Sequence, residues 1–240
     1  VTDPGTGRLL GILGSSDIVD LIGGGRKYQF ISKSHRGNFL SAINDSVRRI
    51  MNTDVLTIDK SGSVKGALDA LLSSKRGGIV IVDKEKIVQG IVTERDFLDL
   101  ALNAASTKKV SSFMTKKVIS ATPGTTLGDV SKIMVRNSFR RLPIVAENRL
   151  VGIVTTRTLI NFIGENGVFG KIVKNDMDEI MSTRVSEVMN HEAATVQKEG
   201  DLKTAARLML STKEGTVCIL DEDRLAGILT ERDVVKTIDL

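Results

Sequence analysis

The last hydrophobic segment of the chain closes with Gly227-Ile228-Leu229-Thr230-Glu231-Arg232-Asp233. Nearly the same heptad occurs earlier as Gly90-Ile91-Val92-Thr93-Glu94-Arg95-Asp96. Two further copies are altered, Gly152-Ile153-Val154-Thr155-Thr156-Arg157-Thr158 and Gly11-Ile12-Leu13-Gly14-Ser15-Ser16-Asp17. The former ends on threonine instead of the acid, and the latter has glycine in place of the hydroxyl residue. Four copies of one heptad indicate an internally repeated protein.

A second landmark precedes three of the heptads at a nearly constant distance. The pattern V-x-x-Φ-M, where Φ is an apolar residue, occurs at 47–51, 110–114 and 185–189. From each methionine to the heptad glycine there are 39, 38 and 38 residues. A pair of landmarks held at this spacing three times predicts three full repeats.

Between the landmarks each repeat predicts the same order of elements. Short strands are expected at 55–58, 118–121 and 194–196, each followed by an amphipathic helix, because apolar residues recur there at i, i+3 and i+4. The predicted core-facing residues are Val64, Leu68, Leu71 and Leu72; Leu127, Val130, Ile133 and Met134; and Leu202, Ala205, Ala206 and Met209. Two strands follow, at 79–82 and 87–92 in the first full repeat, and then a helix begins at the heptad. The pattern predicts an α+β fold built from β-α-β-β-α repeats.

The repeats divide the chain into segments. Residues 1–24 match only the second half of a repeat, which suggests a fragment of a four-repeat protein. The full repeats are expected at 47–104, 107–165 and 184–240, with a linker helix at 25–46 and a second linker at 166–183. Within the first linker, Gly23-Gly24-Gly25 is expected to end a helix and residues 28–44 to form the linking helix.

Composition excludes several functional classes. No run of about 18 apolar residues appears, so no membrane span is expected. His35, His191 and the single Cys218 cannot assemble a metal site or a Cys/His nucleophile, so no enzyme activity and no metal are predicted. Cys218 lies in an apolar run and is expected to be an inert core residue, in keeping with a cytoplasmic location. The charge of +5 comes with only 3% aromatic residues, which favours small anions over nucleic acid.

Together the V-x-x-Φ-M segments, the Arg-Arg-Leu-Pro-Ile-Val strand at 140–145 and the heptads resemble CBS domains. The likeness is strongest to archaeal four-CBS proteins related to the γ subunit of AMP-activated protein kinase, and it extends to residues 23–28 and 38–44 of the linker. The resemblance implies that CBS domains pair into two Bateman modules forming a disc, as a monomer or a homodimer. It implies an energy-sensing regulatory protein that binds AMP, ADP or ATP, needs no cofactor and signals to an unidentified partner protein.

In that family the acid of the heptad accepts hydrogen bonds from the ribose hydroxyls, and its Thr or Ser lines the same cleft. A carboxylate suits a vicinal diol, and hydrogen bonds to a charged group contribute roughly 1.5–3 kcal/mol each. The resemblance therefore assigns ribose binding to Thr93 with Asp96 and to Thr230 with Asp233, and a weaker site to Asp17. Thr158 offers no carboxylate, so no tight nucleotide is expected at its heptad.

The resemblance also implies phosphate and adenine contacts. Phosphate contacts in the family come from basic residues before the second strand, here Arg140 and Arg141, and the heptad arginines Arg95, Arg157 and Arg232 are further candidates. Adenine is expected to lean on the first strand of the paired domain. That strand supplies Ser120, Ala121 and Thr122 for the Asp233 site, and Thr57 and Ile58 for the Asp17 site.

Other interpretations stay open at this point. Thr-x-x-Asp before an apolar helix also fits a capping box, in which the acid accepts the threonine amide, so a purely structural or adaptor protein is the alternative to nucleotide binding. S-adenosylmethionine or a nicotinamide nucleotide carries the same ribose diol with a different charge. Nucleic-acid binding through the basic surface is disfavoured by the scarcity of aromatic residues.

Overall fold

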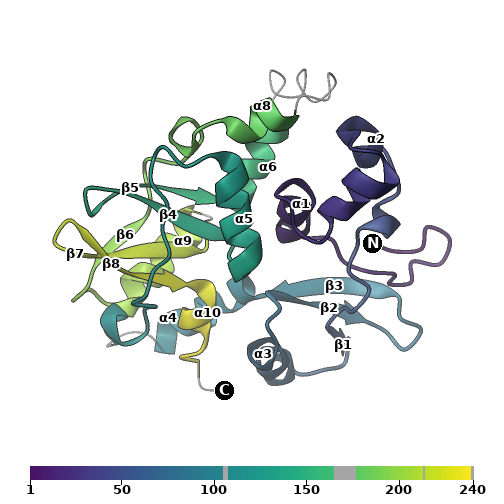
Figure 1. Ribbon diagram of the computed structural model, residues 1–240. Helices are drawn as coiled ribbons and strands as arrows, with labels where there is room; N and C mark the ends of the chain where they lie inside the picture. The colour runs from purple at the N-terminus through teal and green to yellow at the C-terminus, as the bar shows by residue number, and fades with distance from the viewer. Residues whose placement is uncertain (105–107, 165–176, 213, 239–240) are drawn as a thin grey trace. The chain divides into compact units, whose positions relative to one another are not determined.

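The computed structural model describes residues 1–104, 108–164, 177–212 and 214–238 (Figure 1). The chain forms two compact units, each assembled from separate segments. Unit 1 contains Val1–Gly11, Thr53–Val118 and Ala194–Leu240, and unit 2 contains Ile12–Asn52 and Ile119–Ala193. Most of the second and fourth repeats therefore lies in unit 1, and most of the third repeat lies in unit 2 with residues 12–24 of the first.

Two sets of three strands form the strand framework of unit 1. In the second repeat β1 (Thr57–Asp59) pairs parallel with β2 (Gly78–Val82), which pairs antiparallel with β3 (Val88–Thr93). The fourth repeat repeats this order with β6 (Thr195–Gln197), β7 (Thr216–Asp221) and β8 (Arg224–Thr230). The N-terminal hairpin extends the first sheet, because Arg8 forms an antiparallel bridge with Ile87 beside β3.

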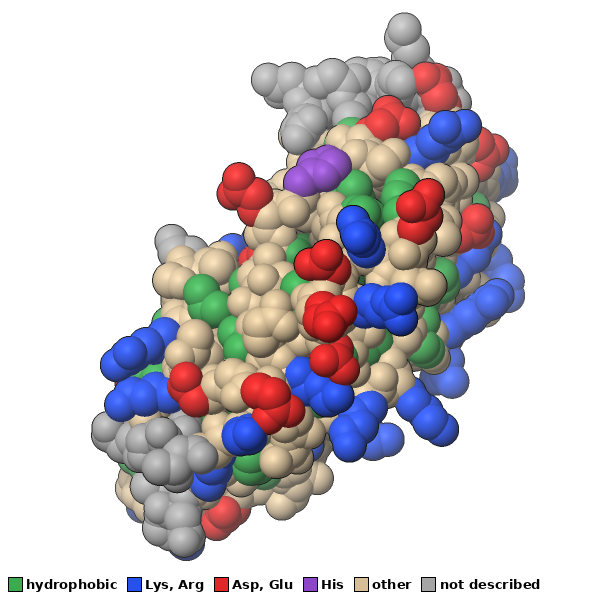
Figure 2. Space-filling view, turned by 90° about the vertical axis from the view of Figure 1, so that its left-hand side faces the viewer, with side chains coloured by type: hydrophobic (Ala, Val, Ile, Leu, Met, Phe, Trp, Pro, Cys, Tyr) green, Lys and Arg blue, Asp and Glu red, His purple; other side chains and the backbone are tan. Residues whose placement is uncertain are grey.

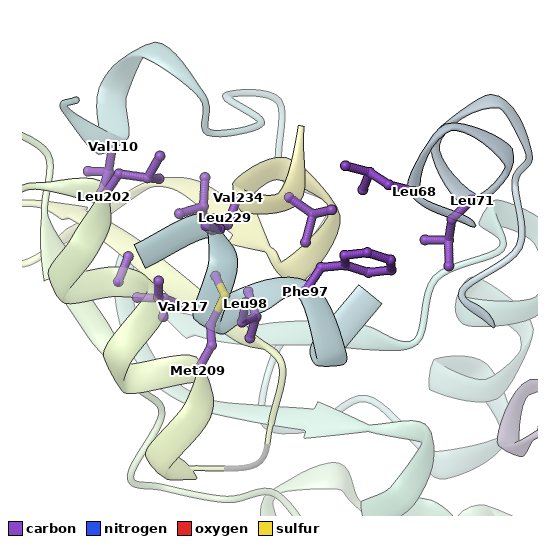
Figure 3. Packing of buried hydrophobic residues seen from close by; sticks show 14 of the residues in the cluster. Leu68, Leu71, Phe97, Leu98, Val110, Leu202, Met209, Val217, Leu229 and Val234 are labelled. Carbon is purple, nitrogen blue, oxygen red and sulfur yellow. The ribbon is translucent and has the colours of Figure 1, made fainter. Parts of the chain in front are cut away.

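One hydrophobic core in unit 1 joins helices of the second and fourth repeats with η4, which comes from the start of the third repeat. These helices are α3 (Val64–Ser73), η3 (Glu94–Phe97) with α4 (Leu98–Ala104), η4 (Val110–Ser112), α9 (Leu202–Thr212) and α10 (Glu231–Val235). Leu98 of α4 and Met209 of α9 are both 0% exposed and lie close together in this core (Figure 3). The amphipathic faces predicted for the second and fourth repeats thus pack against each other, which buries apolar area that a single repeat would leave in water.

Unit 2 contains the third repeat and the helical part of the first. Its strands β4 (Arg141–Ala146) and β5 (Arg149–Thr155) form an antiparallel hairpin. Its helices are α1 (Ser15–Ile22), the π-helix η1 (Phe30–Ser34), α2 (Phe39–Ile43), η2 (Val47–Arg49), α5 (Leu127–Asn137), α6 (Thr156–Gly164), α8 (Met177–Ser182) and η5 (Val185–Glu187). Val19 of α1 packs with Val130 and Met134 of α5 in one core. Leu21 and Ile22 pack with Phe39 and Ile180 in a second.

Most predicted core positions are buried, but the predictions for Val64 and for the linker helix were wrong. Val64 was expected in the core, yet it is 59% exposed, because it lies at the first position of α3, whereas Leu68 and Leu71 are buried. The expected single linker helix is broken at His35–Asn38. Gly37 has φ +80°, which ends the helical path, and Asn38 starts α2 by accepting the Ser41 amide at 2.8 Å.

The expected first strand of the third repeat is reduced to one residue, Ala121, which forms a parallel bridge with Ile144. In the other repeats the equivalent ladder is lengthened by an amide of the second strand. Val80 donates to the Leu56 carbonyl at 3.0 Å, and Cys218 donates to the Ala194 carbonyl at 2.8 Å. The third repeat has Pro143 at this position, and proline has no amide proton to donate.

Figure 2 shows acidic and basic side chains interspersed over one face of the molecule, with hydrophobic side chains in small separate areas. Among the described residues, no helix has the length and apolar character needed to cross a membrane. Cys218 is 0% exposed, and burial, followed by the nearby Glu214 carboxylate, raises the pKa of its thiol to about 12. Its burial confirms the prediction that Cys218 is a core residue.

Candidate functional site

The two complete heptads form the same local structure at the start of η3 and α10. The Thr93 amide and hydroxyl both donate to Asp96 Oδ2, each at 2.8 Å. The Thr230 amide and hydroxyl donate to Asp233 Oδ2 at 3.0 and 2.7 Å. Each carboxylate therefore stabilises the first turn of its own helix, where backbone amides lack intrahelical partners.

The second carboxylate oxygen differs among the three acids. No described residue bonds to Asp96 Oδ1. Asp233 Oδ1 lies 3.5 Å from the exposed ammonium of Lys236, one turn further along the chain. Asp17 uses Oδ2 for the Gly14 amide at 2.7 Å and Oδ1 for Lys27 Nζ, also at 2.7 Å. Both carboxylate oxygens of Asp17 therefore accept hydrogen bonds, whereas within the described part of the chain Asp96 accepts only through Oδ2.

The third heptad forms its cap from two hydroxyls. The Thr155 amide donates to Thr158 Oγ1 at 3.3 Å, and the Thr158 amide donates to Thr155 Oγ1 at 3.1 Å. The helix start is therefore preserved without a carboxylate. A hydroxyl engaged in this way presents no negative charge to a ligand.

Four charged residues connect the two complete heptads of unit 1. Arg95 donates to Glu231 Oε1 at 3.1 Å and to the Leu210 carbonyl at 2.7 Å. Reciprocally, Arg232 donates to Glu94 Oε1, and both glutamate side chains are only 12% exposed. We call Glu94, Arg95, Glu231 and Arg232 the Glu-Arg clasp.

The arginines of the clasp also donate to backbone carbonyls at the C-terminal ends of helices. Arg232 donates to three carbonyls at or just beyond the end of α3, those of Leu71, Ser74 and Arg76, at 2.9, 2.6 and 2.7 Å. Leu210, which accepts from Arg95, lies in the last turn of α9. The last carbonyls of a helix have no intrahelical donor and carry partial negative charge, so a guanidinium is well suited to them.

In unit 2 the corresponding heptad positions make a different contact. Thr156 replaces the glutamate and donates its hydroxyl to Ser15 Oγ of the first heptad at 2.9 Å. Arg157, which corresponds to Arg95 and Arg232, is exposed and has no partner among the described residues. Arg140 is likewise exposed and unpaired within the described part of the chain, whereas Arg141 is half-buried and engaged in an interaction.

The residues expected to contact adenine fall in both units. Thr57 and Ile58 form part of β1 in unit 1, and both are half-buried. Ser120 and Thr122 are exposed on either side of buried Ala121 in unit 2. Since each set belongs to a different unit from the acid that it was expected to serve, their meeting in one cleft stays a prediction. Within the described ranges no group of His, Cys, Asp and Glu could hold a metal ion.

Two features of these heptads were missed from the sequence. The Glu-Arg dipeptide recurs in only the two heptads that share a core, and this pairing was the available signal for the clasp. The ion pair between Lys27 and Asp17 had no such signal, because it depends on how the glycine-rich segment returns the chain to α1.

Comparisons with known proteins agree with this architecture. The CBS domain family model matches residues 47–103, 110–165 and 185–240. The protein MJ1225 of Methanocaldococcus jannaschii is 40% identical over 239 residues, covering 98% of this chain and 85% of that protein. Its crystal structure, described as that of a candidate archaeal homologue of γ-AMPK, has a TM-score of 0.95 and 38% identity, with coverage of 100% of this chain and 87% of that one.

Two less similar proteins also match over most of this chain. A protein of unassigned function from Thermofilum pendens is 24% identical over 95% of this chain and 76% of its own length. A conserved protein from Pyrococcus horikoshii shares the fold with a TM-score of 0.65 at 18% identity, covering 97% of this chain and 87% of that one. On the family match and the identity to MJ1225, this chain belongs to the CBS-domain family.

Proposed function

We propose that this chain is a non-catalytic regulatory protein that binds adenine nucleotides. Its nucleotide-bound state would then regulate a partner protein. In this proposal Asp96 and Asp233, each with its heptad threonine, bind the ribose diol. Arg140, Arg141 and Arg157 contact phosphate groups. The ligand class is AMP, ADP or ATP, which would make the protein a sensor of energy state.

The observation that carries this proposal is the geometry of the heptad carboxylates. One oxygen of Asp96 is anchored by the amide and hydroxyl of Thr93, while Oδ1 keeps its acceptor capacity. Asp233 has the same anchor, and its Oδ1 faces only a long contact from an exposed lysine. A carboxylate held in this manner is pre-organised to accept hydrogen bonds from a diol, and pre-organisation reduces the entropic cost of binding.

The heptad arginines differ in whether their guanidinium groups already donate to other described residues. Arg157 is exposed and unpaired among the described residues, so it is available to an anionic ligand. Four donor contacts of Arg232 already go to Glu94 and backbone carbonyls. A phosphate contact by Arg232 or Arg95 stays a prediction that would require the clasp to open.

Likeness to MJ1225 supports the ligand class, since that protein is described as a candidate homologue of the γ subunit of a kinase named for AMP. A nucleotide can regulate a partner only through the difference between its affinities for two arrangements of the protein. Phosphate number changes the charge presented to Arg140, Arg141 and Arg157. We therefore expect these residues to discriminate AMP from ATP.

Isothermal titration calorimetry with AMP, ADP and ATP tests the proposal. Asp96→Asn and Asp233→Asn are the decisive variants, because an asparagine oxygen still accepts the threonine amide while its NH₂ group cannot accept from ribose. Each variant should bind at least about tenfold more weakly, which corresponds to 1.4 kcal/mol, with little change in the melting temperature of the nucleotide-free protein. Absence of heat at millimolar concentrations of all three nucleotides would refute the proposal.

One alternative is favoured by a specific observation, since the bonds from Thr93 and Thr230 already give Asp96 and Asp233 a structural role. If the heptads are caps and nothing more, Asp233→Ala should lower the melting temperature and no nucleotide should bind. S-adenosylmethionine, included as a competitor against AMP, distinguishes a cationic adenosyl ligand from a phosphorylated one.

A further inference from the structure

The first heptad differs from the two complete heptads in the cation that its acid already binds. Asp17 accepts Lys27 Nζ through Oδ1 at 2.7 Å, and the side chains of Asp17 and Lys27 are only 25% and 21% exposed. The corresponding contact of Asp233 is longer, at 3.5 Å, and its partner Lys236 is 57% exposed. Asp96 Oδ1 accepts from no described residue. Among the described heptad acids, therefore, only Asp17 has both oxygens engaged at close distance.

The ammonium group of Lys27 is also held by a second acceptor. It donates to the carbonyl of Ile50, the Φ residue of the V-x-x-Φ-M segment at 47–51. An exposed lysine that contacts one carboxylate exchanges it readily for water, because the pair contributes little free energy. Lys27 instead loses two charge-assisted hydrogen bonds when it moves away, one to Asp17 and one to Ile50. The contact is therefore harder to displace than that of an ordinary surface lysine.

The backbone before Lys27 brings this residue back beside α1. The Gly25 amide donates to the Asp20 carbonyl at 3.1 Å, and the Lys27 amide donates to Asp20 Oδ1 at 3.3 Å. A Cβ atom at Gly25 would lie 1.6 Å from Asp20 Oδ1, and Gly24 has φ +78°, which glycine adopts without strain. The two glycines thus permit a chain path on which Lys27 reaches the acid of the first heptad.

We infer that Lys27 is a specificity-determining residue, which prevents the first heptad from binding the ribose diol that the complete heptads bind. This inference rests on the proposed function, in which Asp96 and Asp233 accept the diol through Oδ1. A carboxylate oxygen can accept more than one hydrogen bond, but an ammonium 2.7 Å from Asp17 Oδ1 occupies part of the space that a hydroxyl would need. A ligand at the first heptad therefore has to displace Lys27.

The test is a calorimetric titration of the 240-residue chain and its Lys27→Met variant with AMP. Methionine removes the ammonium and keeps an unbranched side chain, so the number of AMP molecules bound per chain below about 1 mM should rise by one. The double variant Lys27→Met with Asp17→Asn should return to the stoichiometry of the parent, which assigns the gained site to the first heptad. Lys27→Arg keeps the charge and should behave as the parent. Lys27→Gln serves if the methionine variant does not fold.

Two controls separate displacement from other roles of a lysine near a nucleotide. Lys236→Met should change affinity at the Asp233 heptad by less than about twofold, because this lysine makes only an exposed contact. Adenosine carries the diol without a phosphate, and its binding should also gain a site in Lys27→Met. A fall in AMP affinity in Lys27→Met would instead identify Lys27 as a phosphate contact and would overturn the inference.

The outcomes also separate this inference from the proposed function. Unchanged stoichiometry in Lys27→Met, when the parent binds AMP, would overturn the inference and leave the proposed function intact. Absence of AMP binding by the parent and by every variant would refute both. A gained site that persists in the double variant with Asp17→Asn would show that the first heptad is not the site that Lys27 blocks, and would overturn the inference as well.

Discussion

The two units join pairs of heptads by different chemistry. In unit 1 the complete heptads are connected by the Glu-Arg clasp, whose four charges are paired across a shared core. In unit 2 the altered heptads are connected by one hydroxyl bond, from Thr156 to Ser15. The same heptad position thus carries an arginine that donates to helix carbonyls, Arg232, in one unit, and in the other an exposed arginine, Arg157, that has no partner among the described residues.

The first helices of the second and third repeats also end in different ways. Helix α3 ends in unit 1 with carbonyls that accept from Arg232. In unit 2 helix α5 is closed by its own backbone, because Ser138 adopts a left-handed conformation with φ 57° and the Phe139 amide donates to the Met134 carbonyl at 2.8 Å. Helix α5 therefore ends on its own backbone hydrogen bonds, whereas the end of α3 accepts hydrogen bonds from an arginine of another repeat.

Removing Arg232 should give the largest effect. Arg232→Met keeps an apolar stem but leaves Glu94 without its cation and three carbonyls without their donor. Breaking a partly buried ion pair of this kind should lower the free energy of unfolding by about 3 kcal/mol. Urea unfolding monitored by circular dichroism measures this change.

The matched controls lie in unit 2. Arg157→Met should change the free energy of unfolding by less than about 0.5 kcal/mol, as expected of an exposed side chain. Thr156→Val, which removes the hydroxyl bond to Ser15, should cost about 1 kcal/mol. Equal losses for Arg232→Met and Arg157→Met would contradict the distinction between the units.

Replacing Thr158 by aspartate should give the third heptad the Thr-x-x-Asp arrangement of the two complete heptads. In Thr158→Asp the new carboxylate can accept the Thr155 amide as Asp96 accepts that of Thr93, so stability should be kept. Under the proposed function, nucleotide affinity at this heptad should rise about tenfold or more, since each hydrogen bond to a charged group contributes roughly 1.5–3 kcal/mol. Calorimetric stoichiometry reports the gain, and an unchanged stoichiometry in a variant whose other sites still bind would contradict it.

Much of the repeat architecture was predictable from the sequence because it depends on local patterns. Heptad spacing and apolar periodicity identified the strands and the amphipathic helices, and Leu202, Ala205, Ala206 and Met209 are all buried as predicted. The shortened strand at Ala121 was not predicted, although its cause, Pro143, was visible. Pro143 shortens the strand because it cannot donate the backbone hydrogen bond that Val80 and Cys218 donate in the other repeats. That effect depends on which residues face each other across the two strands.

The candidate site was predictable only in part. The caps at Asp96 and Asp233 follow from a three-residue spacing, which is a local property. The clasp links residues 136 and 138 positions apart, so it required knowing that the second and fourth repeats share a core. Ligand binding itself stays a prediction. The same Thr-x-x-Asp sequence is expected whether the carboxylate only caps the helix or also binds a diol.

The smallest expected effect concerns pH and the starts of the equivalent helices α9 and α5. In unit 1 Asp201 begins α9 by accepting the Thr204 amide and hydroxyl at 2.7 and 2.8 Å, and the amide bond is the main reason that the pKa of Asp201 is lowered. In unit 2 the order is reversed: the Thr126 hydroxyl caps α5, and Lys132, followed by Thr126, lowers the pKa of Asp129.

A lowered folded-state pKa means that the contribution of Asp201 is complete above the unfolded value, ordinarily 3.8, and is lost as the pH falls through the folded value. Asp201→Thr gives α9 the hydroxyl cap of α5, which does not titrate. The free energy of unfolding of this variant should therefore fall less than that of the parent between about pH 5 and about pH 3. The difference should be small because Asp201 is exposed. Identical pH dependence in parent and variant would mean that this cap does not distinguish the two helix starts.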